Sequence, residues 1–279
     1  MITKNIHAEP FVKWVGGKRQ LLPYILPLIP EYTVYYEPFL GGGAVFFSEM
    51  PKKAVINDLN EELINCYRVI KDVPYELLDY LNFHSLNNCS EYFYKIRNLD
   101  RQKEVYASLP TTEKAARTIY LNKTCYNGLY RVNSSGEFNA PFGKYKNPNI
   151  INKETILAVS EFLNAIDVEI YAGDYRNILG NVRPGAFVYL DPPYMPIKYD
   201  SFTGYTAEGF DVNEQIALKN ECDYLNNIGA KFLLSNSYCD FIEKLYDKYI
   251  ITRVPAKRNI NSCGAGRGPI YELLIRNYN

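Results

Sequence analysis

Short apolar runs recur along the chain, and prolines, glycines or polar residues bound each of them. Runs of this length, rich in β-branched and aromatic side chains, are typical of strands buried in a sheet. They predict strands over residues 34–37, 54–57, 168–171, 186–190, 231–234, 250–254 and 270–276. We expect the last of these to be an edge strand.

Helical patterns occupy much of the sequence between these runs. Helices are predicted over residues 61–70 and 214–227, and helical patterns continue to about Lys123, with Pro74 and Pro110 as helix starters. The alternation of strands and helices predicts an α/β fold, in which a Rossmann-like, mostly parallel sheet has helices on both faces.

Residues 127–149 have a different character, because glycines, prolines and serines alternate there with aromatic residues. This composition is typical of a hairpin-rich loop. We therefore predict an inserted, mainly helical domain carrying a β-hairpin over residues 75–149. Residues 1–74 and 150–279 would form the larger domain around the sheet.

The composition restricts the class of protein. The 279 residues, 47% of them hydrophobic, suit one large domain with an insertion. No apolar run is long enough to span a membrane, and residues 1–10 lack the apolar core of a secretory signal. The six cysteines show no CxxC spacing and there are two histidines, so we expect no zinc site and reduced thiols in a cytoplasm.

Charge is unevenly distributed although the net charge is zero. Residues 114–153 carry an excess of six positive charges, with Glu137 the single acid, and the remainder carries an excess of six negative charges. A basic segment on a neutral protein suits contact with phosphates. A solvated helix face is the alternative.

Four residues directly after the apolar run 186–190 carry the clearest chemistry: Asp191-Pro192-Pro193-Tyr194. Ligands of open α/β sheets bind where such strands end. The Asp191 carboxylate can accept one N–H, and the rigidly directed carbonyl of Pro192 can accept another. The Tyr194 ring can stack on a base. The tetrapeptide suits a grip on a planar amine, and a simple rigid turn is the alternative.

Glycines follow another predicted strand, in the segment 35–44. Gly41, Gly42 and Gly43 allow a ligand to approach the backbone closely. Contiguous glycines are not the GxGxxG dinucleotide fingerprint, and Glu37 at the strand end favours a ligand with a positive group. A plain tight turn is the alternative.

Acids also end two further predicted strands. Asp58 lies about 20 residues after the glycine turn, the spacing of an acid that accepts ribose hydroxyls in nucleoside-binding folds. Asp174 can accept a hydrogen bond from a purine amine. Either residue can instead cap the following helix.

The segment 13–19, Lys-Trp-Val-Gly-Gly-Lys-Arg, lies in a glycine loop. It is not a phosphate-binding P-loop, because Val12 stands where that motif requires glycine and Arg19 where it requires Ser or Thr. A tryptophan between Lys13 and Lys18 better suits stacking combined with capture of a carboxylate.

Taken together, these motifs resemble the Dam family of DNA adenine-N6 methyltransferases (D12 class, α group), particularly the members that modify GATC in restriction–modification systems. The resemblance runs nearly from end to end. Residues 13–18 look like the opening cofactor motif, 37–44 like the S-adenosylmethionine loop, and 191–194 like the methyl-transfer motif. Their order along the chain, with the recognition domain inserted between them, is that of the α group.

The resemblance implies a class I S-adenosylmethionine-dependent methyltransferase fold, with residues 75–149 as the DNA target-recognition domain. It implies S-adenosyl-L-methionine as cofactor, S-adenosyl-L-homocysteine as product and no metal. The implied catalytic residues are Asp191, Pro192, Pro193 and Tyr194. The implied cofactor-binding residues are Trp14, Lys18, Glu37, Phe39, Gly41, Gly43, Asp58, Asp174 and Asp191.

The implied partner is double-stranded DNA. Tyr126 and Asn127 would occupy the space of a flipped base, while Leu129, Arg131 and Pro141 would read the outer bases. Arginine can bond both guanine O6 and N7, and an apolar contact suits the thymine methyl group. The implied DNA-binding residues are Lys13, Tyr126, Asn127, Leu129, Arg131, Asn133, Pro141, Lys144, Tyr145 and Arg267, the last in the loop 258–268.

The expected reaction is direct methyl transfer to N6 of an adenine flipped out of the duplex, since N6 cannot be reached inside the stack. Residues 195–210 would form a lid that orders on DNA. The assignment to GATC and to a monomer on DNA rests on the resemblance alone. So does the expected setting, which is either a restriction–modification system, whose endonuclease acts on the same site without a stable complex, or an orphan methylase. A cytosine-N4 methyltransferase, an RNA adenine methyltransferase and a catalytically silent DNA-binding protein are the alternatives.

Overall fold

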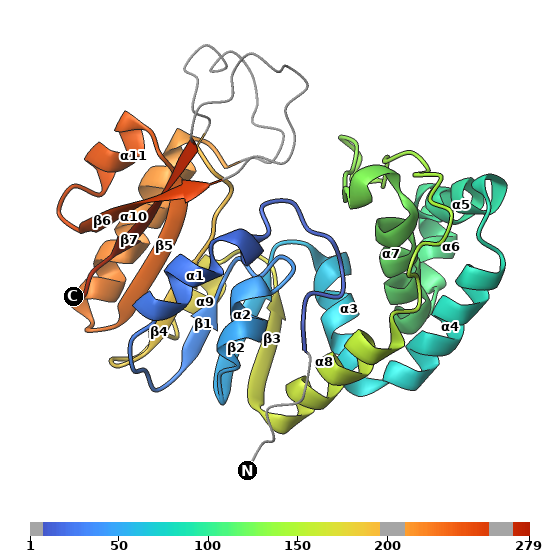
Figure 1. Cartoon of the computed structure of the whole chain (residues 1–279), viewed down its shortest axis with the longest axis horizontal. Helices are drawn as coiled ribbons and strands as arrows, with labels where there is room; N and C mark the ends of the chain where they lie inside the picture. Colours follow the sequence, from blue (N-terminus) through green and yellow to red (C-terminus); the bar gives the residue numbers. More distant parts are fainter. Residues whose placement is uncertain (1–7, 196–209, 257–269) are drawn as a thin grey trace. The chain divides into compact units, whose positions relative to one another are not determined.

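The computed structural model describes residues 8–195, 210–256 and 270–279. Within them, seven strands form one sheet (Figure 1). The strands are β1 (Tyr35–Glu37), β2 (Lys53–Asp58), β3 (Asp167–Ala172), β4 (Phe187–Leu190), β5 (Lys231–Ser237), β6 (Ile250–Ala256) and β7 (Ile270–Arg276). Each predicted strand is confirmed, with ends that differ by at most three residues.

The strand order is β3-β2-β1-β4-β5-β7-β6. β1 is parallel to β2 and β4, and β4 is parallel to β5, while β7 is antiparallel to both of its neighbours. The predicted mostly parallel α/β sheet is therefore confirmed. The prediction that residues 270–276 form an edge strand is wrong. Their apolar side chains Leu273, Leu274 and Ile275 are fully buried because β7 lies between β5 and β6.

The helices fall between the strands and in the segment after β2. The α-helices are α1 (Leu22–Ile25), α2 (Ala44–Glu49), α3 (Glu61–Asp72), α4 (Pro74–Leu86), α5 (Ser90–Arg97), α6 (Lys103–Ser108), α7 (Thr111–Thr124), α8 (Lys153–Ala165), α9 (Arg176–Leu179), α10 (Val212–Asn227) and α11 (Asp240–Leu245). Short 3-10 turns occur at η1 (Lys18–Gln20), η2 (Leu26–Leu28), η3 (Asn98–Arg101) and η4 (Tyr126–Gly128).

Local chemistry explains several helix starts. The Asn60 side chain accepts the N–H of Leu63 at the start of α3, and Asp211 accepts the N–H of Glu214 at the start of α10. Pro74 occupies the first turn of α4, where its missing N–H costs nothing. Helix α8 was absent from the sequence-based prediction.

Two compact units make up the described chain. The first unit comprises residues 8–17, Gly41–Met50 and Asp58–Gly173, and the second comprises Lys18–Leu40, Pro51–Asn57 and the described residues from Asp174 onward. This division differs from the boundaries proposed from sequence. The assignment of DNA recognition to residues 75–149 concerns function and stays a prediction.

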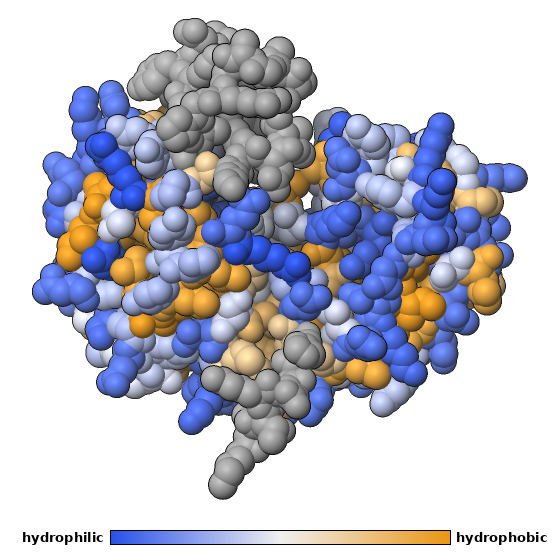
Figure 2. Space-filling model, in the orientation of Figure 1, coloured by the Kyte–Doolittle hydropathy of each residue, from blue (hydrophilic) through white to orange (hydrophobic). Residues whose placement is uncertain are grey.

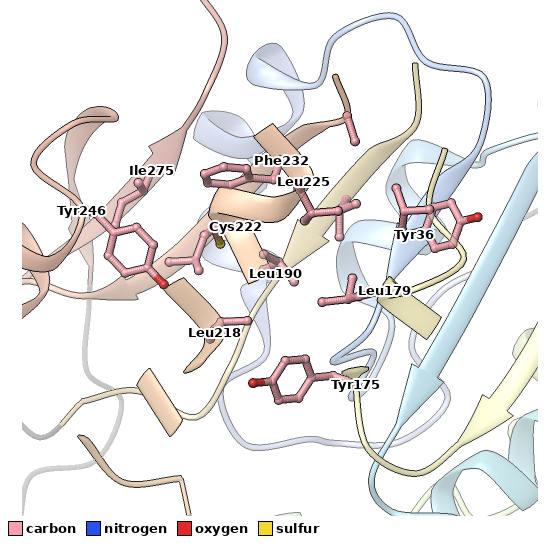
Figure 3. Close-up of a cluster of buried hydrophobic side chains, with 14 of the residues drawn as sticks. Tyr36, Tyr175, Leu179, Leu190, Leu218, Cys222, Leu225, Phe232, Tyr246 and Ile275 are labelled. Carbon is pink, nitrogen blue, oxygen red and sulfur yellow. The ribbon is translucent and has the colours of Figure 1, made fainter. Parts of the chain in front are cut away.

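The second unit has its own hydrophobic core on β1, β4, β5 and β7, with α10 packed against β5 (Figure 3). Side chains from α9, β4, α10 and β5 meet there, and the cluster includes Leu179, Leu190, Leu218, Cys222, Leu225 and Phe232. Burial of these side chains fixes the carboxyl ends of β1, β4 and β5, since a packed interior tolerates little displacement.

In the first unit, α7 packs against α3, α4 and α5 (Figure 1). The chain after α7 turns back through two isolated antiparallel bridges, Cys125–Phe142 and Val132–Phe138. We call residues 125–146 the hairpin loop. The predicted hairpin is thus present as a loop with two bridges rather than as a continuous ladder.

On the face shown in Figure 2, hydrophilic residues cover much of the surface and hydrophobic residues form patches between them. Within the described ranges, no helix is long and apolar enough to cross a membrane. The five described cysteines are free thiols: Cys66, Cys89, Cys125, Cys222 and Cys239.

Candidate active site

The strand order of the sheet reverses between β1 and β4, two adjacent parallel strands of the second unit. Glu37 ends β1, and Asp191 directly follows the last residue of β4, Leu190. Ligands of open α/β sheets bind outside the carboxyl ends of the strands at this reversal. The tetrapeptide 191–194 therefore begins where the fold favours a binding site.

The Asp191 carboxylate is held on one side. Its Oδ1 lies 2.8 Å from the Lys18 ammonium and accepts a 2.8 Å hydrogen bond from the Ser235 hydroxyl. Lys18 is almost fully buried and the Asp191 side chain is 18% exposed, so the ion pair is partly shielded from water. No third residue of the described chain bonds this carboxylate, and the lone pairs of Oδ2 are therefore available to a ligand.

The Tyr194 side chain has contacts at its hydroxyl and over its ring. Its hydroxyl donates a 2.6 Å hydrogen bond to Glu272 on β7, and the Lys18 ammonium lies 4.6 Å from the ring centroid. Burial, reinforced by the nearby carboxylates of Asp191 and Glu272, raises the pKa of the Tyr194 hydroxyl well above its usual value. The hydroxyl therefore keeps its proton and remains the donor to Glu272.

The two prolines differ in what their carbonyl groups contact. The Pro193 carbonyl accepts a 2.9 Å hydrogen bond from the side-chain amide of Gln215 on α10. No donor in the described part of the chain bonds the Pro192 carbonyl. The tetrapeptide thus presents two available acceptors, Pro192 O and Asp191 Oδ2. A primary amine, with two N–H groups, matches that pair.

Four residues that hold the tetrapeptide were absent from the sequence-based prediction: Gln215, Ser235, Asn236 and Glu272. A pattern in the sequence could have identified two of them, Ser235 and Asn236. Residues 235–237, Ser-Asn-Ser, directly continue the apolar strand 231–234, and polar residues at the carboxyl end of a buried strand indicate a site. Gln215 and Glu272 lie on a helix and a strand far away in sequence, and no local pattern marks them.

The glycine turn belongs to the first unit and is tied to Asp58. Gly41 donates its N–H to Asp58 Oδ2 at 2.8 Å, and Asn60 donates its N–H to Oδ1 at 2.9 Å. Burial raises the pKa of Asp58, and the two backbone N–H groups oppose this. A carboxylate has about four lone-pair sites, so Asp58 can still accept two hydroxyl groups. It fits the predicted ribose-binding role.

Positive φ angles and close neighbours explain why glycine is required at two positions. Gly41 and Gly43 have φ of 51° and 71°. A Cβ at Gly41 would lie 2.9 Å from Trp14 Cδ1, and one at Gly43 would lie 2.8 Å from the Tyr67 hydroxyl. The Trp14 ring also stacks on Tyr130, with centroids 5.1 Å apart. Trp14 therefore lies against the glycine turn, in agreement with its place in the opening motif.

Glu37 and Phe39 belong to the second unit and precede the glycine turn in the sequence. Glu37 is buried and accepts a 2.6 Å hydrogen bond from the Tyr35 hydroxyl. The Phe39 ring packs at 4.9 Å from that of Tyr175. The carboxylate supplies negative charge and the aromatic ring a flat apolar face, as a cofactor with a positive group and a base requires.

Asp174 has a local structural role. Its Oδ1 accepts the N–H of Arg176 at 2.9 Å and its Oδ2 pairs with the guanidinium of the same residue at 3.0 Å. Arg176 also pairs with Glu214. The capping interpretation thus describes what Asp174 does in the structure, and its predicted contact with the cofactor stays a prediction.

Most predicted DNA-binding residues are exposed. Leu129 and Asn133 are half-buried, and the exposed members are Lys13, Tyr126, Asn127, Arg131, Pro141, Lys144 and Tyr145. Arg131 donates a 2.6 Å hydrogen bond from Nε to the side chain of Asn139 across the hairpin loop.

Lys13 is joined to the hairpin loop within the first unit. Its main chain exchanges hydrogen bonds of 2.9 and 2.8 Å with the Asn122 amide, which also bonds the Gly128 carbonyl. The Lys13 ammonium lies 5.6 Å from the centre of the Tyr145 ring. The structure therefore brings these two predicted DNA-binding residues together.

One member of the basic segment is not available to phosphates. Arg117 is 4% exposed, and its guanidinium bonds the carbonyls of Ile96 and Arg97 and pairs with Asp100. The prediction that Arg117 belongs to an exposed basic surface is therefore wrong, because its guanidinium makes hydrogen bonds and an ion pair inside the protein.

Two predicted features lie outside the described residues: Arg267 with its loop, and all but the ends of the segment 195–210. Among residues that are described, no group of three or more His, Cys, Asp or Glu side chains could hold a metal ion.

Comparisons with known proteins agree on one family. A profile described as D12 class N6 adenine-specific DNA methyltransferase matches residues 14–260. The chain is 44% identical over 281 residues to the Type II methyltransferase M1.LlaDCHI of Lactococcus lactis subsp. cremoris, covering 100% of this chain and 99% of that one.

Two further relatives extend the similarity to other organisms. The Type II methyltransferase M.MjaIII of Methanocaldococcus jannaschii is 42% identical over 294 residues, covering 98% of this chain and 100% of that one. The DNA adenine methylase of Escherichia coli strain K12 is 32% identical over 267 residues, covering 95% and 93%.

Proposed function

Because this chain belongs to the family of D12 class N6 adenine-specific DNA methyltransferases, we propose that it transfers the methyl group of S-adenosylmethionine to N6 of an adenine flipped out of double-stranded DNA. We propose GATC as the sequence that contains this adenine. The observation that carries the proposal is the pair of available acceptors after β4, Asp191 Oδ2 and the Pro192 carbonyl.

Those two acceptors suit the adenine amine. Each takes one N–H of N6, which draws the nitrogen lone pair out of conjugation with the ring and leaves it available for attack. As N6 attacks, positive charge develops on it, and the Asp191 carboxylate stabilises that charge in a site partly shielded from water. The Tyr194 ring, held by Glu272, offers a stacking surface for the base.

Bound S-adenosylmethionine supplies an electrophilic methyl group. Asp58 has lone pairs for the ribose hydroxyls, and the glycine turn beside Trp14 allows close approach to the backbone. In the second unit, Glu37 and Phe39 supply a carboxylate and an aromatic face. Lys18, whose ammonium pairs with Asp191, is proposed to contribute to cofactor binding through that ion pair. The proton that leaves N6 passes to solvent after transfer, so a general base is not part of this proposal.

The hairpin loop is proposed to recognise the site, together with Lys13. Arg131 is exposed and can bond guanine O6 and N7, while Leu129 and Pro141 suit contact with a thymine methyl group. Tyr126 and Asn127 would occupy the space that the flipped base leaves. Lys144 and Tyr145 would contact the backbone, which fixes register without reading sequence.

The biological setting is proposed from two relatives. Those proteins are named Type II methyltransferases, so we propose that this enzyme protects DNA in the cytoplasm against an endonuclease that recognises the same site. We propose further that the enzyme acts as a monomer and forms no stable complex with the endonuclease.

Labelled S-adenosylmethionine tests the proposed function directly. Purified protein is incubated separately with a GATC duplex, with a duplex of the same composition in scrambled order, and with an RNA of the GATC duplex sequence, and the products are digested to nucleosides. We expect label in N6-methyladenine from the GATC duplex alone. Label in N4-methylcytosine, transfer only to RNA, or binding without transfer would each overturn the proposal in favour of a different class of protein.

A further inference from the structure

The tetrapeptide 191–194 lies in no helix or strand, so its geometry depends on side chains of neighbouring elements. Its immediate support comes from β5 and α10 of the same unit. Ser235, Asn236 and Gln215 are each completely buried, and polar groups buried to that degree are retained where they are hydrogen-bonded.

Ser235 is the donor that holds the carboxylate. Its hydroxyl bonds Asp191 Oδ1 at 2.8 Å and lies 3.2 Å from the Tyr189 hydroxyl. Serine has one hydroxyl proton. Since that proton is given to Asp191, the Tyr189 hydroxyl is the donor to Ser235. Burial raises the pKa of Tyr189 well above its usual value, so this hydroxyl keeps its proton.

Gln215 and Asn236 hold the far end of the tetrapeptide. Gln215 donates to the Pro193 carbonyl at 2.9 Å and accepts a 3.0 Å hydrogen bond from the Asn236 amide. Asn236 Oδ1 in turn accepts the N–H of Met195 at 3.3 Å. The two side chains therefore form a continuous chain of hydrogen bonds from one side of Pro193 to the backbone after Tyr194.

Two acceptors at the tetrapeptide are occupied by protein donors and two others are available. Asp191 Oδ1 and the Pro193 carbonyl are occupied by Ser235 and Gln215, whereas Asp191 Oδ2 and the Pro192 carbonyl have no such partner among the described residues. If Ser235 were absent, the Lys18 ammonium alone would hold Oδ1, and the carboxylate would have more freedom to rotate about its χ2, because terminal sp³–sp² torsions are broad. If Gln215 were absent, the Pro193 carbonyl would become a competing acceptor.

We propose that Ser235 and Gln215, with Asn236 behind Gln215, are positioning residues that restrict the tetrapeptide to the two acceptors able to grip the target amine. They contact no substrate themselves, and they act through Asp191 and Pro193. This inference rests on the proposed function, since it deepens the role of the same site.

The test separates the rate of methyl transfer from binding. Single-turnover transfer to a GATC duplex is measured for Ser235→Ala and Gln215→Met, with dissociation constants for DNA and for S-adenosylmethionine and the thermal midpoint of each variant. Loss of one hydrogen bond to a charged group corresponds to a rate lower by about 10- to 100-fold. We expect a fall of that size for Ser235→Ala, with both dissociation constants changed by less than about 3-fold.

Two further variants separate positioning from folding. Ser235→Thr keeps the hydroxyl donor and should restore most of the rate. Tyr246→Phe removes a buried hydroxyl of the same unit that bonds neither Ser235 nor the tetrapeptide among the described residues, and should transfer within about 3-fold of the parent rate.

The possible outcomes are distinct. Parent-like rates for both Ser235→Ala and Gln215→Met overturn the positioning role while leaving the proposed function intact. So does a fall in rate for Tyr246→Phe equal to that for Ser235→Ala, because the effect then follows loss of any buried hydroxyl. Absence of transfer by the parent protein on every DNA duplex defeats the proposed function instead.

Discussion

The guanidinium of Arg117 and the carboxylate of Asp100 lie 2.6 Å apart, and both side chains are nearly buried. Asp100 Oδ2 also accepts the N–H of Phe138 at 2.7 Å, and Arg101 donates to the Phe138 carbonyl at 3.0 Å. Phe138 belongs to a bridge of the hairpin loop. The ion pair thus joins helix α7 to the loop that is proposed to read DNA.

Asp100→Asn should weaken both the fold and DNA recognition. The substitution leaves the Arg117 charge buried without its counterion, and breaking such a pair costs on the order of 3 kcal/mol of unfolding free energy. We expect a lower denaturation midpoint and weaker binding to a GATC duplex, measured by urea unfolding and fluorescence anisotropy.

Asp79→Asn is the matched control for that experiment. Asp79 is exposed on α4, so the same change there should alter stability by less than about 0.5 kcal/mol. Equal stability of Asp100→Asn and Asp79→Asn would show that the Arg117 pair contributes nothing.

Asp191→Ala should abolish methyl transfer while leaving cofactor binding measurable. Removal of the carboxylate eliminates one acceptor for the amine and the charge that stabilises the transition state, and loss of such a group lowers rates by at least about 100-fold. Transfer is measured with labelled S-adenosylmethionine, and cofactor affinity by calorimetry. Full activity in this variant would contradict the proposed mechanism.

Arg131→Ala should change the sequence specificity of DNA binding, whereas Lys144→Gln should change its overall affinity. If Arg131 bonds a guanine, its loss costs about 1–3 kcal/mol and relaxes specificity at one base pair. If Lys144 contacts a phosphate, its loss weakens binding to all sequences and lowers the salt dependence by about one unit. Titrations of cognate and single-mismatch duplexes at several salt concentrations measure both effects. Identical sequence preference for the two variants would contradict these assignments.

His84 should make the fold sensitive to acid. Burial lowers the pKa of this imidazole to about 4, and its Nε2 has no hydrogen-bond partner among the residues that the structure describes. The folded pKa lies below the unfolded value, so the unfolded chain binds more protons between pH 6.5 and 4, and stability falls as the pH is lowered through that window. The full effect is on the order of 3 kcal/mol.

Unfolding free energies from urea titrations at intervals between pH 7 and 4 measure that loss. His84→Gln should show a flatter dependence, because the titrating group is gone. Parallel curves for the parent and the variant would assign the acid sensitivity to other groups.

The sequence was sufficient to predict those parts of the fold that depend on local pattern. Apolar runs located every strand, and the polar residues after them located Glu37, Asp58 and Asp191. The position of β7 could not be predicted in this way, because strand order depends on pairing between distant segments. An antiparallel strand buried between two neighbours has the same composition as one at an edge.

Side-chain partners were the other feature that local pattern could not supply. Arg117 looked like part of a basic surface, since its charge is visible in sequence and its burial is not. In the same way, nothing near Gln215 or Glu272 in the sequence indicates that their side chains bond the Pro193 carbonyl and the Tyr194 hydroxyl.

The insertion of β7 between β5 and β6 makes the candidate site depend on strands that supply none of its predicted contact residues. β6 pairs only with β7 in the described sheet, and Glu272 on β7 orients Tyr194. β7 is held by β5 on one side and by β6 on the other. A substitution that loosens either pairing would therefore displace the Glu272 carboxylate and leave the Tyr194 ring without its anchor, although the tetrapeptide itself is unchanged.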